Sequence, residues 1–239
     1  MLNKYFASQC SVDESNHDLP PMHNANANSL QSILITQEEV IDSIKCLKVG
    51  KASGPDGIDN RILKEAMHQL SNPLCDLFNS CLKTCKMPSC WKIANVCPIF
   101  KKGDPSLASN YRPISLLNTT EKIFERILHK HIFNFLRANA FFAPTQSGFL
   151  PGDSTVNQLT YIYNSFCKAL DNGLEVRVVF FDISKAFEKV WHKGVLCKLQ
   201  QAGIRGNLLS CLSNYLADRK QTVILPPLKF SSESLKALF

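Results

Sequence analysis

Apolar residues recur at helical spacing along much of the chain. Thr36 and Glu39 stand as a capping-box pair before such a run, which predicts a helix ending near Lys48. Pro73 is expected to open a further helix. Residues 1–32 lack this periodicity, so we expect a disordered N-terminal segment. The same spacing predicts helices over 62–70, 74–85, 119–136, 156–170, 194–201 and 207–217.

β-branched and apolar residues predict strands in four segments. These segments are 91–100, 111–116, 176–183 and 221–225. Residues 101–105 separate the first two as a polar turn, so we expect a short β-ribbon. Segment 176–183 is the clearest strand, because its apolar residues are nearly continuous, as in strands buried on both faces. The fold class expected from these elements is α+β.

Composition indicates a globular chain with a mildly basic surface. The chain has 239 residues, 45% hydrophobic and 20% charged, which suits one large domain or two lobes. The net charge of +7 permits a nucleic-acid partner without requiring one. Ten cysteines include no CxxC pair, which favours buried thiols over a zinc site. We see no signal-peptide core or membrane-length apolar run, so we expect an intracellular setting and no membrane partner.

Asp182 is the residue that suggests chemistry. It ends the apolar segment 176–183, where an ionised carboxylate is costly unless it is paired or binds a metal. An aspartate at a strand end also commonly caps the following turn. From this residue alone, both interpretations stay open.

The residues after Asp182 change the picture. Segment 182–192, DISKAFEKVWH, resembles the first catalytic motif of reverse transcriptases. Four other segments resemble the same family in the same order, from about residue 36 to residue 223. They are KASGPDGI (51–58), YRPISLL (111–117), QSGF (146–149) and YLADRKQ (215–221). The chain therefore resembles the reverse-transcriptase domain of a jockey-like non-LTR retrotransposon.

The resemblance implies a right-hand polymerase fold that is present in part. Residues 33–172 would be a fingers-like helical region with the β-ribbon, and 173–225 the N-terminal part of the palm. Residues 226–239 do not continue the resemblance and read as a divergent tail. The activity implied is nucleotidyl transfer, in which two Mg²⁺ ions stabilise the attacking and leaving oxygens. The implied partners are an RNA template, a DNA primer and deoxynucleoside triphosphates.

The resemblance also assigns roles residue by residue. Asp182 would be a catalytic metal ligand, with the carbonyl of Ile183 beside it. The backbone N–H groups of Lys185 and Ala186 would face the triphosphate. Phe187 would lie under the sugar and exclude a 2′-hydroxyl, although without the motif a plain core position would be the simpler interpretation.

Three cations of the β-ribbon are the other candidates. By resemblance, Lys101 and Arg112 lie over the triphosphate, and Arg112 offers a planar fork suited to phosphate oxygens. Lys102 fits a solvated basic turn equally well. Segment 146–149 is expected to support the template side of the cleft as scaffold only.

The family's later carboxylate hairpin is absent from the sequence. The chain has no Asp-Asp pair, and after Asp182 its acidic residues are Glu188, Asp218 and Glu233. We therefore expect an incomplete palm sheet, C-terminally truncated relative to the family pattern, and no polymerisation by this chain alone. Two alternatives remain open: a non-catalytic remnant that binds RNA or an RNA–DNA hybrid, and a decayed remnant without function.

Overall fold

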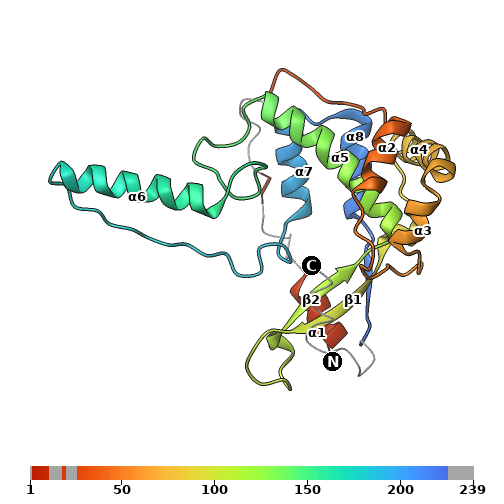
Figure 1. The fold of residues 1–239 in the computed structure, drawn as a ribbon, viewed down its shortest axis with the longest axis horizontal. Helices are drawn as coiled ribbons and strands as arrows, with labels where there is room; N and C mark the ends of the chain where they lie inside the picture. Colours follow the sequence, from red (N-terminus) through yellow and green to blue (C-terminus); the bar gives the residue numbers. More distant parts are fainter. Residues whose placement is uncertain (1, 11–17, 20–25, 226–239) are drawn as a thin grey trace.

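The computed structural model describes residues 2–10, 18–19 and 26–225. In this part of the chain, a group of helices packs at one end of a small β-sheet (Figure 1). The helices are α1 (Leu2–Gln9), α2 (Gln37–Lys45), α3 (Asn60–Glu65), α4 (Met67–Thr84), α5 (Thr119–Ala138), α6 (Thr155–Asp171), α7 (His192–Gln201) and α8 (Gly206–Leu216). The strands are β1 (Ile93–Phe100), β2 (Tyr111–Leu116) and β3 (Lys220–Val223), and the α+β class is confirmed.

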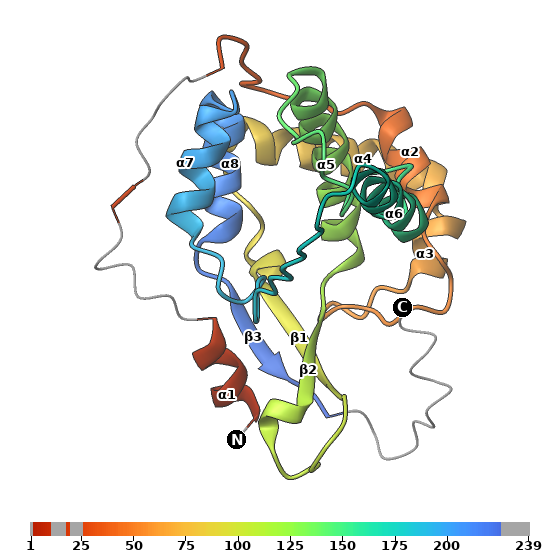
Figure 2. The same cartoon turned by 90° about the vertical axis from the view of Figure 1, so that its left-hand side faces the viewer.

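The sheet is mixed, with the strand order β2-β1-β3. Strands β1 and β2 form the expected antiparallel ribbon, in which Phe100 pairs with Tyr111. Strand β3 runs parallel to β1, and its Lys220 pairs with Ile93. A parallel pair needs a long crossover, which here passes through the helices before returning to the sheet (Figure 2). The pairing of β1 with β3 therefore joins residues far apart in the sequence, such as Ile93 and Lys220.

Three aromatic rings form the centre of the helical core. Phe78 of α4, Phe124 of α5 and Trp91 are all buried, with ring centroids 5.1 Å to 6.0 Å apart. Aromatic pairs at such separations are favourable beyond the area they bury. Apolar side chains of α2 and α8 complete the same cluster. Helices α2, α4, α5 and α8 therefore share one core.

Local signals placed most helix ends correctly. Thr36 and Glu39 make the reciprocal capping box at the start of α2. The expected break at Pro73 is wrong, because α4 runs unbroken with Pro73 inside it. A helix-interior proline removes one backbone hydrogen bond. Leu74 and Phe78, which follow the proline in the same helix, are buried in the core.

The beginning of the chain contains a helix where a disordered segment was expected. Residues 2–9 form α1, and Phe6 is only 3% exposed. Helix α1 packs beside β3 (Figure 2). Residues 226–239, expected as a divergent tail, lie outside the described residues. The boundaries expected for the fingers and palm stay predictions.

The strand expected over residues 176–183 does not form. These residues have no regular secondary structure, and Phe180 and Phe181 are each 90% exposed. Helix α6, just before them, buries no residue and projects away from the helical core (Figure 1). A strand requires a hydrogen-bonded neighbour, and within the described residues the sheet contains β1, β2 and β3 only. Although residues 176–183 are apolar, no described strand lies beside them, so they do not form a strand.

Among the described helices, none combines the length and apolar character needed to cross a bilayer.

Candidate active site

The motif residues after the expected strand lie on an exposed loop between α6 and α7. Asp182, Ile183, Lys185, Ala186 and Phe187 are all exposed. The backbone turns between residues 184 and 189, where the N–H of Lys189 donates to the carbonyl of Lys185 at 3.1 Å. Lys185 has φ +56°, a left-handed conformation uncommon for a side-chain-bearing residue. The motif residues therefore lie in an exposed turn and not at the end of a buried strand.

The β-ribbon presents Lys101 and Arg112 from a well-ordered turn. Arg112 lies on β2 opposite Ile99, and Lys101 donates its backbone N–H to Asn110 at 2.8 Å. A carboxylate oxygen of Asp104 accepts the N–H of Ser106 at 2.8 Å, a bond that lowers the pKa of that carboxyl. Both cationic side chains are exposed. The ribbon thus holds them on a rigid support without sequestering them.

Two of the motif segments meet through their aromatic rings. Phe149 and Phe187 pack edge to face, with ring centroids 6.1 Å apart and planes at 82°. Phe149 also has a positive φ of 61°. Phe149 of segment 146–149 thus contacts the ring that the resemblance places under the sugar, and both rings are exposed. Within the described part of the chain, no hydrogen bond, ion pair or ring contact joins this loop to Lys101 or Arg112.

Helix α1 contacts the same loop from another side. The Lys185 ammonium lies 5.4 Å from the centre of the Tyr5 ring and 3.5 Å from the Tyr5 hydroxyl oxygen. It also donates to the side-chain oxygen of Gln9. No sequence signal pointed to this contact, because about 175 residues separate the partners. The side chain of Lys185 is thus engaged by α1.

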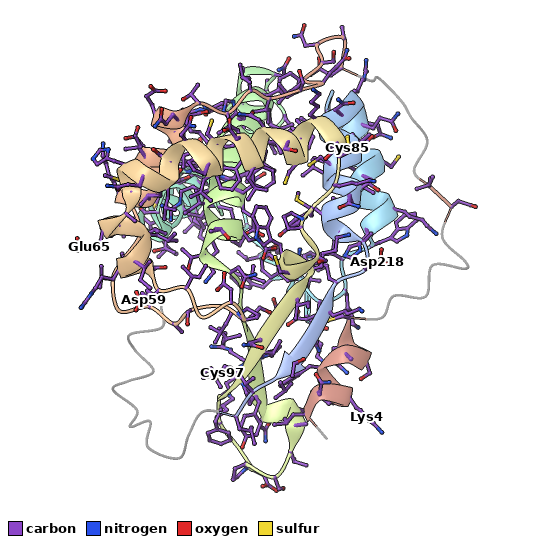
Figure 3. All side chains as sticks on the ribbon, turned by 90° about the vertical axis from the view of Figure 1, so that its right-hand side faces the viewer. Lys4, Asp59, Glu65, Cys85, Cys97 and Asp218 are labelled. Atoms are coloured by element: carbon purple, nitrogen blue, oxygen red, sulfur yellow. The ribbon has the colours of Figure 1, made fainter. Side chains whose placement is uncertain are left out.

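A buried ion pair anchors the sheet to the helices. Glu121 of α5 is 1% exposed, and its Oε1 accepts from Arg219 at 2.9 Å. Arg219 follows Asp218 in the turn between α8 and β3 (Figure 3). The guanidinium also donates to the carbonyl of Trp91 at 3.5 Å and lies over the ring of Tyr215, 4.7 Å from its centre. This one side chain therefore ties the start of β3 to α5, α8 and the residues that lead into β1.

The environment of Glu121 disfavours its charge. Burial is the main reason that the pKa of Glu121 rises to about 7, and Arg219 only partly opposes it. Glu121 Oε2 has no hydrogen-bond partner among the described residues. The Tyr215 hydroxyl donates a hydrogen bond to the nearby Glu125 carboxylate, and burial, followed by the charge of Glu125, raises the pKa of Tyr215. This cluster was missed from sequence, because a glutamate in the first turn of a helix is ordinary.

The loop residues alone do not make a complete two-magnesium site. Asp182 supplies one carboxylate, and the described residues contain no group of three or more His, Cys, Asp or Glu side chains able to hold a metal. Magnesium binding in proteins typically uses one or two carboxylates together with substrate phosphates, and a pair of ions needs shared ligands. No chemical step is therefore assigned through a metal. The loop presents the Asp182 carboxylate, the backbone amides of Lys185 and Ala186, and the Phe187 ring.

Comparison with known families identifies the class of protein. A family model described as "Reverse transcriptase (RNA-dependent DNA polymerase)" matches residues 99–233. The matched range covers more than half of the chain and contains Arg112, Asp182 and Phe187. The chain belongs to the reverse transcriptase family.

Within that family, the chain is related to jockey-like non-LTR retrotransposons. It is 34% identical over 174 residues to the RNA-directed DNA polymerase from mobile element jockey of Drosophila melanogaster, covering 72% of this chain and 19% of the relative. It is 31% identical over 187 residues to the probable RNA-directed DNA polymerase from transposon BS of the same species, covering 78% and 20%. It is 32% identical over 186 residues to the probable polymerase from transposon X-element, covering 77% and 20%. The chain thus spans about a fifth of the length of these relatives.

Proposed function

We propose that this chain is the fingers and first palm part of an RNA-directed DNA polymerase, and that by itself it binds substrates without polymerising DNA. The family match that includes Asp182 carries the proposal. Residues 33–172 would act as fingers, and 173–225 as the beginning of the palm. In a complete site, Asp182 and the Ile183 carbonyl would contribute to a two-magnesium centre.

The structure supports separate roles for the loop and the ribbon. Exposed Lys101 and Arg112 on a rigid ribbon suit an anionic triphosphate, since Arg binds phosphate oxygens through a planar fork. The amides of Lys185 and Ala186 lie in a turn, a geometry that often binds anions. Phe187, braced by Phe149, would then exclude a ribose hydroxyl. An intracellular setting, an RNA template and a DNA primer are part of this proposal.

The absence of polymerisation follows from counting carboxylates. The 239 residues contain no consecutive pair of aspartates, so Asp182 lacks the companions that the family's chemistry uses. Losing one preorganised electrostatic contact in an active site costs about 10²–10³ in rate. Losing the ligands of a second Mg²⁺ ion lowers the rate further. Binding of nucleic acid by basic side chains does not depend on these carboxylates.

Primer extension and hybrid binding test the proposal together. Purified chain is incubated with a primed RNA template, deoxynucleoside triphosphates and Mg²⁺, with Asp182→Asn as the matched control. We expect no incorporation above the control, but salt-sensitive binding of the RNA–DNA hybrid that Asp182→Asn leaves unchanged. Incorporation that disappears in Asp182→Asn would refute inactivity while confirming the polymerase role. A chain that binds neither hybrid nor triphosphate would refute the proposal itself.

A further inference from the structure

The contact between α1 and the motif loop involves the residue expected to meet the triphosphate. Lys185 makes three interactions with α1: with the Tyr5 ring, the Tyr5 hydroxyl and the Gln9 side chain. The ring and the hydroxyl belong to one residue, so two side chains of α1, those of Tyr5 and Gln9, engage the Lys185 ammonium. While α1 engages it, the Lys185 ammonium is kept from a phosphate that sits over the neighbouring backbone amides.

Helix α1 is held in place independently of Lys185. Phe6 points into the protein and is 3% exposed, and α1 packs beside β3 (Figure 2). Burying a phenylalanine is worth roughly 1.5–3 kcal/mol relative to leaving it exposed. Lys4 projects from α1 into solvent (Figure 3). The helix thus has a buried face, an outward face and an end that reaches the loop.

The electrostatics of this end of α1 favour a cation. Carbonyl groups at a helix C-terminus carry partial negative charge, and the last turn of α1 has no basic residue of its own. Lys185 supplies that cation from a distant part of the sequence. On the same loop, Glu188 is close enough to Cys10 to contribute, after partial burial, to raising the pKa of its thiol. Lys185 and Glu188 of the loop therefore both lie near the end of α1.

We propose that α1 is an autoinhibitory strap, which engages the Lys185 side chain and keeps it from an anionic ligand at the Asp182–Phe187 loop. The inference rests on the proposed function, because the anion is the triphosphate of an incoming nucleotide. In the closed population α1 contacts Lys185, and in the open population it does not. Apparent affinity for the anion is reduced by the fraction that is open.

The first experiment measures the contact without any nucleotide. Amine acylation followed by peptide mass spectrometry compares Lys185, which α1 engages, with Lys4 on the outer face of α1 in the same sample. Tyr5→Ala/Gln9→Ala removes the partners but leaves the Phe6 anchor, and Lys4→Ala is the matched control on the outer face. We expect Lys185 to be slow in the wild-type chain and roughly fivefold faster in the double variant, the size of an exposed cation–π contact plus one hydrogen bond. Equal rates in the two proteins would overturn the strap.

The second experiment asks whether release exposes an anion site. Binding of a fluorescent deoxynucleoside triphosphate is measured by anisotropy for the wild-type chain, the double variant and Lys4→Ala. We expect roughly fivefold tighter binding by the double variant and no change for Lys4→Ala. Phe6→Ala provides a second route to release and should act in the same direction, with circular dichroism reporting whether the fold is retained.

The two proposals fail in different ways. If the wild-type chain binds triphosphate in an Arg112-dependent manner, and release of α1 does not tighten binding, the strap is refuted while the proposed function stands. If no variant binds triphosphate although Lys185 becomes reactive, the nucleotide site is refuted and autoinhibition of it falls as well. Tighter triphosphate binding together with increased Lys185 reactivity in the double variant supports the strap, provided that the gain in binding is lost when Lys185→Gln is added to that variant.

Discussion

Glu121→Gln tests whether the buried carboxylate of α5 stabilises or destabilises the protein at neutral pH. Glutamine keeps the shape and one hydrogen-bond acceptor for Arg219 but cannot ionise. The Glu121 pKa rises from an ordinary 4.5 to about 7, chiefly through burial. We therefore expect the wild-type chain, but not the variant, to lose stability as its carboxyl ionises.

The sign and size follow from proton linkage. The folded state holds the Glu121 proton more tightly than the unfolded state does. The stabilisation that this proton gives is therefore fully present below pH 4.5 and is lost as pH rises through about 7. At about 1.36 kcal/mol per pKa unit, the loss approaches roughly 3 kcal/mol. Once pH is well above 7 and the folded carboxyl is fully ionised, the difference should stay constant. Glu121→Gln should thus become progressively more stable than wild type between pH 4.5 and 7.

Urea unfolding followed by tryptophan fluorescence provides the assay. Trp91 is 4% exposed and packs on Phe78 and Phe124, so its emission reports on the core. The free energy of unfolding is measured for both proteins from pH 5 to pH 8.5. Groups that the two proteins share contribute equally to both free energies of unfolding and cancel in the difference. Glu65→Gln, which changes an exposed carboxylate, is the matched control (Figure 3).

The opposite result has a clear meaning. If the ion pair with Arg219 outweighs burial, removing the charge would leave a guanidinium without its partner. Breaking a buried pair in this way typically costs about 3–5 kcal/mol. A variant that is less stable than wild type at pH 8, with the gap closing as pH falls, would refute the claim that burial dominates at Glu121.

Two further variants test the packing. Phe78→Ala should lower the free energy of unfolding by about 3–5 kcal/mol, because Phe78 is fully buried between Trp91 and Phe124, and thermal denaturation should show it. Gly54→Ala should destabilise strongly, because a Cβ there would lie 2.5 Å from the backbone of Leu117, whereas Gly148→Ala meets no atom within 4 Å and should unfold close to wild type. Equal melting temperatures for the two alanine variants would contradict the close approach at Gly54.

Local sequence signals predicted the elements that depend on local interactions. The capping box at Thr36 and Glu39 fixed the beginning of α2, because both partners lie within one turn. Helical periodicity predicted α5 and α6 correctly, and the turn after residue 100 indicated the β-ribbon. The ordered motif segments identified the family. Each of these signals needs only a few neighbouring residues.

Features that depend on distant partners were missed. The Arg219–Glu121 pair joins residues 98 apart, and position 121 alone looks like an ordinary helix-start glutamate. The contact of Lys185 with α1 is more distant still. The residue types over 176–183 do favour a strand, but a strand also needs a neighbouring strand to pair with. Pairing is decided by topology, which apolar periodicity does not report.

The residues that stabilise the helical core are different from the residues around Asp182. Helices α2, α4, α5 and α8 bury a shared core that does not use residues 176–187. Val179, Phe180 and Phe181 instead remain exposed, as a strand does before it has a neighbour. Pairing them with another strand would bury apolar surface and fix the direction of Asp182 in one event. We therefore expect a strand neighbour, where one pairs with this segment, to set the orientation of the Asp182 carboxylate, and we expect the helical core to form independently of that pairing.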